Sequence, residues 1–291
     1  MKIIKIVVLL IVVLIVIVGC FLGGFIYKAK KGINFYSTAP VSLPVFTGDK
    51  TILIFSKTNG FRHGAAIEES LLLYKSLAIE NGWTLFLTDD AGVFNKLQLD
   101  KFKVVIWNNT SGKVLTDEQR IEFKNWIEGG GGFVGIHAAG DDSHQWDWYA
   151  QEVLQANFSH HNIGAHLDTA RLYLEVDSTN SVITEGLRDT FELADEWYCF
   201  YENPRDHSST IVYTVDESTY DVNGNIGFPL IDNLLHADKN WGMGSDHPIV
   251  WYHQQKAGRV FYVAPGHSQE TFRNKNYQKV LRNAINWVGD F

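Results

Sequence analysis

Cysteine is scarce in this chain of 291 residues, which contains only Cys20 and Cys199. Cys20 lies in an apolar N-terminal segment and Cys199 lies far along the chain, so a disulfide within the soluble part is not expected in any compartment. An excess of basic charge is also missing, because the formal net charge is -8 and the isoelectric point is near 5.7. Binding to the phosphate backbone needs a basic surface, so DNA and RNA are not expected partners.

Repeats and several familiar motifs are missing as well. The sequence has no internal period, no HExxH zinc motif and no Cys-x-x-Cys-His haem-attachment motif. Its composition is that of an ordinary globular protein, with 45% hydrophobic and 20% charged residues. We therefore expect one large soluble domain with a full hydrophobic core.

The longest apolar stretch lies at the N-terminus, from Ile3 to Tyr27, and Lys5 is its one charged residue. A helix of this length rises roughly 37 Å, which is enough to cross the hydrocarbon core of a membrane. We predict a single-pass transmembrane anchor over residues 1–30, with the remaining chain facing the periplasmic or extracellular side. The residues before Cys20 also look like a lipoprotein cleavage site, although the apolar run continues past this cysteine.

The remaining chain divides into a short connection and the domain. Residues 31–49 contain two prolines and no strong periodicity, so we expect an extended tether before a domain over residues 50–291. In the first half of the domain, nearly continuous apolar runs alternate with amphipathic patterns, as expected of a parallel sheet buried between helices. Strands are predicted at residues 51–56, 83–87, 104–107, 133–136, 170–176, 210–215, 249–252 and 260–263.

Three helices complete the predicted fold. They follow residue 64, begin at a capping box formed by Thr116 and Gln119, and close the chain at residues 277–288. Alternating strands and helices are typical of an α/β fold with a doubly wound, mostly parallel sheet of the flavodoxin-like type. In such a sheet, ligands bind beside the carboxyl ends of the strands, so the loops there are the places to look for a site.

Two of these loops carry chemically active side chains. Arg62 and His63 follow the first strand and stand beside the N-terminus of a helix, where anionic or hydroxyl-rich ligands bind; a capping loop is the alternative. His137 follows the fourth strand, and small residues on both sides permit a sharp turn that presents its ring; a buried structural histidine is the alternative. No serine or cysteine stands at this turn, so triad chemistry lacks its nucleophile.

The middle and end of the chain add more candidates. His160, His161 and His166 form a histidine-rich patch that could ligate a divalent metal such as zinc, although its spacing matches no metal signature and local hydrogen bonding would also explain it. Asp195 and Glu196 could act as a general base or hold a sugar hydroxyl. The other candidates for substrate binding in this part of the chain are Tyr198, His247 and His267.

We expect the loops that bear His63, His137 and His267 to open at one edge of the sheet. The three imidazoles would then belong to one shared pocket. Coordinates that place them at opposite ends of the sheet would contradict this hypothesis.

Five motifs occur in an order that resembles the ThuA-like (trehalose utilisation) family. The motifs are Gly60-Phe61-Arg62-His63, Gly135-Ile136-His137-Ala138-Ala139, Asp195-Glu196-Trp197-Tyr198, His247-Pro248-Ile249-Val250-Trp251, and Gly258-Arg259-Val260-Phe261-Tyr262 followed by Gly266-His267. The resemblance covers roughly residues 50 to 289 and implies a fold similar to class I glutamine amidotransferases. Those enzymes carry a cysteine nucleophile where this sequence has His137, so amidotransferase chemistry is not expected.

The resemblance implies a role in carbohydrate metabolism, including that of disaccharides and oxidised 3-keto sugars. In one interpretation the protein is a hydrolase, lyase or isomerase in which His137, Asp195 and Glu196 transfer protons. In a second it is a non-catalytic sugar-binding module. In a third, which the resemblance allows, it is a structural partner of a membrane oxidoreductase such as a dehydrogenase.

Overall fold

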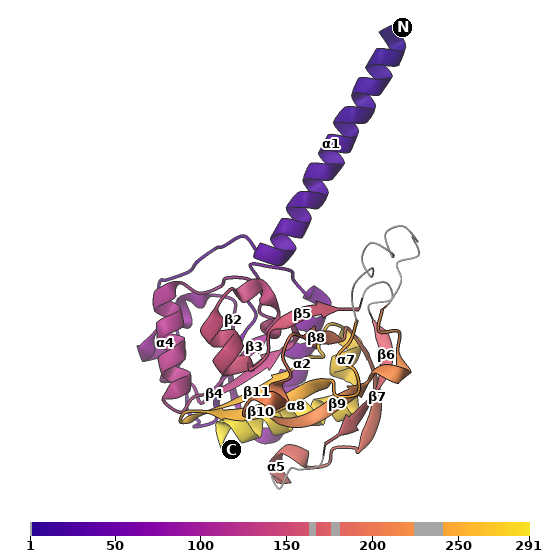
Figure 1. Ribbon diagram of the computed structural model, residues 1–291. Helices are drawn as coiled ribbons and strands as arrows, with labels where there is room; N and C mark the ends of the chain where they lie inside the picture. Colours follow the sequence, from indigo (N-terminus) through magenta and orange to yellow (C-terminus); the bar gives the residue numbers. More distant parts are fainter. Residues whose placement is uncertain (1, 163–166, 176–180, 224–240) are drawn as a thin grey trace.

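The computed structural model describes residues 2–162, 167–175, 181–223 and 241–291. Among these residues, nine strands form one sheet in the order β2-β1-β3-β4-β11-β10-β9-β6-β7 (Figure 1). The strands are β1 (Thr51–Phe55), β2 (Thr84–Thr88), β3 (Val104–Asn108), β4 (Gly132–Ile136), β6 (Asp168–Leu174), β7 (Thr190–Asp195), β9 (Thr210–Asp216), β10 (Pro248–Gln255) and β11 (Gly258–Val263).

The sheet has a parallel half and an antiparallel half. Strands β2, β1, β3, β4 and β11 are all parallel, whereas the pairings from β11 through β10, β9 and β6 to β7 are antiparallel. Four antiparallel steps restore the original direction, so β7 runs the same way as β1, β4 and β11. The carboxyl ends of these four strands therefore lie at one edge of the sheet, which we call the C-terminal edge.

Helices enclose the parallel half. The α-helices of the domain, among the described residues, are α2 (Gly64–Asn81), α3 (Lys96–Leu99), α4 (Asp117–Glu128), α5 (Ser181–Thr184), α7 (Gln269–Arg273) and α8 (Lys275–Gly289). Every residue of β1, β3 and β4 is buried, which requires cover on both faces of the sheet. Phe123 of α4 stacks on Trp107 of β3 with ring centroids 5.3 Å apart, and α8 contacts β3, β4 and β11.

A second, two-stranded sheet carries residues of the site. Strand β5 (Phe158–His161) pairs antiparallel with β8 (Tyr198–Phe200), so that His161 lies opposite Tyr198. Because β8 follows β7 after two residues, this small sheet belongs to the C-terminal edge.

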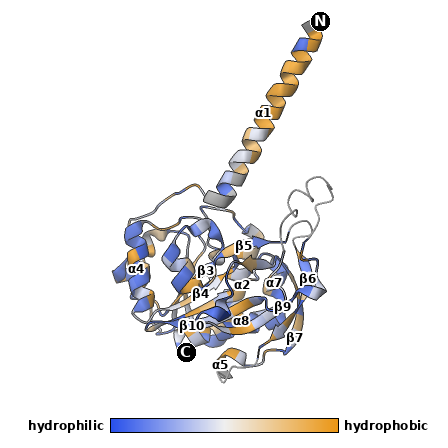
Figure 2. Cartoon of the chain, in the orientation of Figure 1, coloured by the Kyte–Doolittle hydropathy of each residue, from blue (hydrophilic) through white to orange (hydrophobic). Residues whose placement is uncertain are grey.

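Helix α1 (Lys2–Lys31) projects from the domain, and its outer part is strongly apolar (Figure 2). Residues Ile3–Phe25 are exposed and are long and apolar enough to cross a membrane, a property that signal sequences share. The connection that follows has no regular structure and lies along the domain. The backbone N–H of Ile33 donates to the carbonyl of Asn59 at 2.8 Å, and Gln119 Nε2 donates to the carbonyl of Ser37 at 2.7 Å.

The predicted α/β fold class is confirmed. The eight predicted strands and three predicted helices all occur, although the predicted end of one strand, Val176, lies outside the described residues. The capping box of α4 is present as predicted, because Thr116 Oγ1 accepts from the backbone of Gln119 and the Gln119 side chain accepts from the backbone of Thr116. Strands β5, β7 and β8 were not predicted, nor was the antiparallel pairing of β10, β9, β6 and β7.

Candidate functional site

Four side chains from separate loops meet at the C-terminal edge. A ring nitrogen from each of His63, His137 and His267 and a carboxylate oxygen of Glu196 all lie within 4.8 Å of one another. We call these four residues the histidine cluster. His63 stands before α2, and the other three follow β4, β11 and β7. The structure thus brings together the three histidines that the sequence analysis expected at one edge.

His137 begins the sharp turn after β4. Its φ of +48° is unusual for a residue with a side chain, as in the strained strand-to-helix turns that present catalytic groups. The ring is fully buried, and Nδ1 lies 2.8 Å from the carbonyl oxygen of Ala264. A carbonyl only accepts, so Nδ1 carries a proton and Nε2 faces Glu196.

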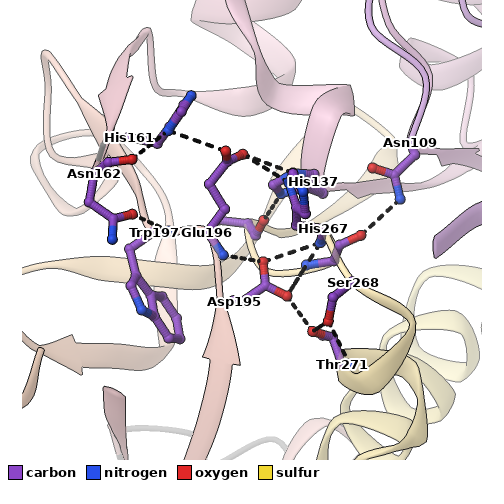
Figure 3. Close-up of polar contacts among 12 residues, drawn as sticks. Asn109, His137, His161, Asn162, Asp195, Glu196, Trp197, His267, Ser268 and Thr271 are labelled. Atoms are coloured by element: carbon purple, nitrogen blue, oxygen red, sulfur yellow. Dashed lines mark hydrogen bonds and ion pairs between the residues drawn. The ribbon is translucent and has the colours of Figure 1, made fainter. Parts of the chain in front are cut away.

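Glu196 is contacted on both of its carboxylate oxygens (Figure 3). Oε2 lies 3.3 Å from His137 Nε2 and 3.2 Å from His267 Nδ1, whereas Oε1 lies 3.2 Å from His161 Nδ1. Burial alone would raise the pKa of Glu196, but the imidazoles of His137 and His267 hold this pKa well below its usual range. Glu196 is therefore a buried carboxylate that remains ionised.

His63 and His267 differ in their electrostatic state. Burial, followed by repulsion from His137 and His267, lowers the pKa of His63 well below its ordinary value. Burial also acts to lower the pKa of His267, but the hydrogen bond and charge of Glu196 outweigh it and raise that pKa. The cluster thus combines a neutral imidazole, His63, with one that favours its protonated form, His267.

Asp195, predicted as catalytic, lies behind the cluster (Figure 3). Its carboxylate accepts hydrogen bonds from the backbone N–H groups of Gly266, at 3.0 Å, and His267, at 3.2 Å, and from the hydroxyl of Thr271. Burial raises the pKa of Asp195, although these donors oppose the shift. In this position Asp195 fixes the turn that carries His267.

Three predicted substrate-binding residues have different surroundings. Tyr198 is buried, and its ring centroid lies 4.4 Å from that of His137, so it forms a wall of the cluster. Arg62 is exposed and donates to the carbonyl of Ser56 at 3.3 Å. His247 is buried outside the cluster, where Nδ1 lies 2.7 Å from Glu217 Oε1 and Nε2 lies 2.9 Å from the carbonyl of Tyr198.

The predicted metal-binding patch is divided. His161 contacts Glu196 from the outer side, with 40% of its side chain exposed. The ring of His160 lies against Trp241, with centroids 4.6 Å apart. His166 lies outside the described residues. Glu196 was predicted to transfer protons together with His137, but the sequence did not indicate that it also contacts His267 and lies beside His63, because no fixed spacing links these loops.

A cavity of about 470 Å³ lies beside the turn that His137 begins. Its lining combines aromatic rings with carboxylates, a combination suited to sugars because rings stack on sugar faces and carboxylates accept from hydroxyls. The residues that supply these groups are Asp141, Asp142, Trp146, Asp147, Tyr201 and Glu202. We call this cavity the acidic groove. The cluster residues do not line it, but Gly140 ends the turn that starts at His137 and lines the groove.

The sheet and its helices define an α/β domain with a mixed, mostly parallel sheet, in which the turn after β4 carries His137 and no cysteine. Within this class, the chain belongs to the ThuA family, described as "Trehalose utilisation", whose profile matches residues 51–288. No curated protein matches the chain.

Solved structures support the same assignment. A ThuA-like protein of Bacteroides uniformis ATCC 8492 is 25% identical, with a TM-score of 0.67 over 87% of this chain and 94% of its own. A ThuA-like protein of Parabacteroides merdae ATCC 43184 is 17% identical, with a TM-score of 0.59 over 82% and 90%. A cytoplasmic protein of Salmonella typhimurium LT2 shares the fold at 11% identity, with a TM-score of 0.53 over 82% and 99%.

Proposed function

We propose that this protein is a membrane-anchored enzyme that processes a small carbohydrate, a disaccharide or a 3-keto sugar, by proton transfer at the histidine cluster. The observation that carries the proposal is the buried, ionised Glu196, whose two oxygens are contacted by His137, His267 and His161. The family supports a sugar as the substrate class, because it is linked to trehalose utilisation.

The cluster offers both partners that acid–base catalysis needs. Glu196 is ionised and can accept a proton once a substrate displaces the imidazoles that lower its pKa, and His267, which favours its protonated form, can donate one. Partial exposure of His267 and His161, at 18% and 40% of their side chains, gives a substrate access to these groups. The acidic groove supplies an adjoining surface for sugar hydroxyls and rings.

Purified protein incubated with disaccharides and 3-keto-glycosides in D₂O should convert at least one of them or exchange its carbon-bound hydrogen for deuterium, as followed by NMR. Glu196→Gln keeps the shape of the side chain but removes the base, so we expect the rate to fall by about 10²- to 10⁴-fold. His137→Ala should abolish the conversion. His207→Ala, which removes an exposed histidine outside the cluster, is the matched control and should leave the rate unchanged.

Equal inactivity of wild type and Glu196→Gln on every sugar would contradict the catalytic proposal. In that case, calorimetry that detects sugar binding without turnover would favour the non-catalytic binding module.

A further inference from the structure

The histidine cluster contains the ligand set of a transition-metal site. Imidazole nitrogens and a carboxylate oxygen are the ligands that zinc takes in catalytic centres, with bonds of about 2.0–2.2 Å. Ligands at these bond lengths lie roughly 3.3 Å apart along the edges of a tetrahedron. Two pairs in the cluster already have this spacing, namely Glu196 Oε2 with His137 Nε2 at 3.3 Å and with His267 Nδ1 at 3.2 Å.

The orientation of His137 leaves one ring nitrogen for a ligand. Nδ1 lies 2.8 Å from the carbonyl oxygen of Ala264, so Nε2 is the nitrogen that faces the interior of the cluster. It lies 3.3 Å from Glu196 Oε2 in a buried place. Among the described residues, Nε2 has no partner with hydrogen-bond geometry, and the same is true of the buried Nδ1 of His63. A cation between these atoms would satisfy both nitrogens and the carboxylate.

The surroundings resemble the supporting shell of a metal site. Ligating histidines usually donate their second N–H to a backbone carbonyl, as His137 does to Ala264. The turn bearing His267 is fixed by Asp195, which accepts from the backbone of His267 and of Gly266. The rings of His63, His137 and His267 stand nearly perpendicular, with interplanar angles of 81° to 84°, so their edges converge.

From this geometry we propose that His63, His137, His267 and Glu196 bind one divalent transition-metal ion of the zinc type. Three nitrogen ligands favour such an ion over Mg²⁺ or Ca²⁺, which prefer oxygen. The inference deepens the proposed function by naming a cofactor for the same site. It rests on that function only for the ion's catalytic role: with Glu196 and His267 as ligands, a bound ion would replace them as the acid–base pair, by activating water or polarising a sugar carbonyl.

The test measures the metal itself. Full-length protein purified in detergent is stripped with a chelator, and Zn²⁺ is then titrated against a chromophoric competitor. We expect one equivalent per chain by elemental analysis, and a rise in melting temperature on loading, because an ion that binds the folded state stabilises it. Co²⁺ should give the visible absorption of a low-symmetry nitrogen site, whereas Mg²⁺ should not compete.

Variants locate the ion. We expect zinc binding to weaken by about tenfold to a hundredfold in each of three variants, His137→Ala, His267→Asn and Glu196→Gln. His207→Ala, which removes an exposed imidazole outside the cluster, should leave zinc binding unchanged. If His137→Ala does not fold, His267→Asn still decides the question, because the His267 side chain is 18% exposed and the variant should fold.

Absence of stoichiometric zinc from folded wild-type protein would overturn the proposal. Zinc binding that all three variants leave unchanged would also overturn it, since the ion would then lie elsewhere. Sugar conversion is assayed in parallel on stripped and loaded protein. Stoichiometric zinc without conversion rejects only the proposed function, and conversion by protein that never binds zinc rejects only the metal site.

Discussion

Asp141 is a carboxyl group in a place that disfavours its charge. It lines the acidic groove with 16% of its side chain exposed, and its Oδ1 accepts from the backbone N–H of Ser143 at 2.9 Å. Burial raises the pKa of Asp141 to about 7, although the hydrogen bonds from Ser143 oppose this shift. In the unfolded chain the same group ionises near its ordinary pKa of 3.8. Between these values the folded protein holds an extra proton, so this contribution to stability is complete below pH 3.8 and is lost as the pH rises through 7.

Asp141→Asn should remove this loss, because its amide resembles the protonated carboxyl. We compare the free energy of unfolding of the variant with that of wild type. This difference should rise in favour of the variant by at least about 1 kcal/mol as the pH increases from 5 to 8, since one pKa unit corresponds to 1.36 kcal/mol. Urea unfolding at both pH values measures the difference. Asp142→Asn changes the exposed neighbour and should show no such trend. A difference that stays constant with pH would contradict the assignment.

Single residues of the site were only partly predictable. His63, His137 and His267 could be selected from the sequence because each follows a recognisable strand of a parallel sheet. The partner of His247 could not be identified from the sequence. This partner, Glu217, lies 30 residues earlier, and only the fold brings the two side chains within 2.7 Å. The same holds for Asp195, whose carboxylate accepts from a turn more than 70 residues away.

The connection between β11 and α7 depends on Gly266. Its φ is +147°, and a Cβ at this position would lie 2.9 Å from Ile136 Cγ2 and 3.1 Å from His137 Cβ. The turn is held from two sides, because the backbone N–H of Gly266 donates to Asp195 and its carbonyl accepts from Asn109 Nδ2 at 3.0 Å. A side chain here would therefore push the His267 turn away from the His137 turn.

Gly266→Ala should destabilise the protein by about 1–3 kcal/mol, the usual cost of a strained backbone conformation, and should weaken ligand binding at the cluster. Denaturant unfolding measures the first effect, and zinc or sugar titration measures the second. Gly64→Ala is the matched control, because nothing lies within 4 Å of a Cβ there and alanine favours the helix that Gly64 begins. Equal stability of the two variants would contradict this role of Gly266.

At the scale of elements, the predicted strands are those with continuous apolar runs, such as β1, β3 and β4. Strand β7 was not predicted because its apolar residues alternate with polar ones. This pattern of period two buries Phe191, Leu193 and Asp195 on one side of the strand. Strands β5 and β8 have four and three residues, and β5 contains Ser159 and two histidines, so their pairing depends on the completed sheet. Strands β6, β9 and β10 could therefore be predicted, whereas their antiparallel pairing with one another and with β7 could not.

At the scale of the whole molecule, α1 leaves the domain beside the candidate site. Gly32 follows the helix with a φ of +74°, and the next residue, Ile33, donates to the carbonyl of Asn59, four residues before His63 in the chain. Helix α1 also contacts residues Asp142–His144, which border the acidic groove, and it emerges on the side where β5 lies (Figure 1). An α1 that spans a membrane would therefore turn the C-terminal edge, with its histidine cluster, toward the lipid surface.

This orientation predicts different distances of the two sheet edges from the bilayer. A fluorophore on Asp142→Cys marks the C-terminal edge, and one on Ala257→Cys marks the opposite edge, at the turn between β10 and β11; both positions are exposed. The strands between them span roughly 20 Å, given about 3.3 Å per residue. In liposomes, with Cys20 replaced by serine, headgroup-labelled quencher lipids should quench the first fluorophore strongly and the second weakly. Equal quenching would mean that the domain reorients freely on its connection, because the contacts of Ile33 and Gln119 would then not hold it in place.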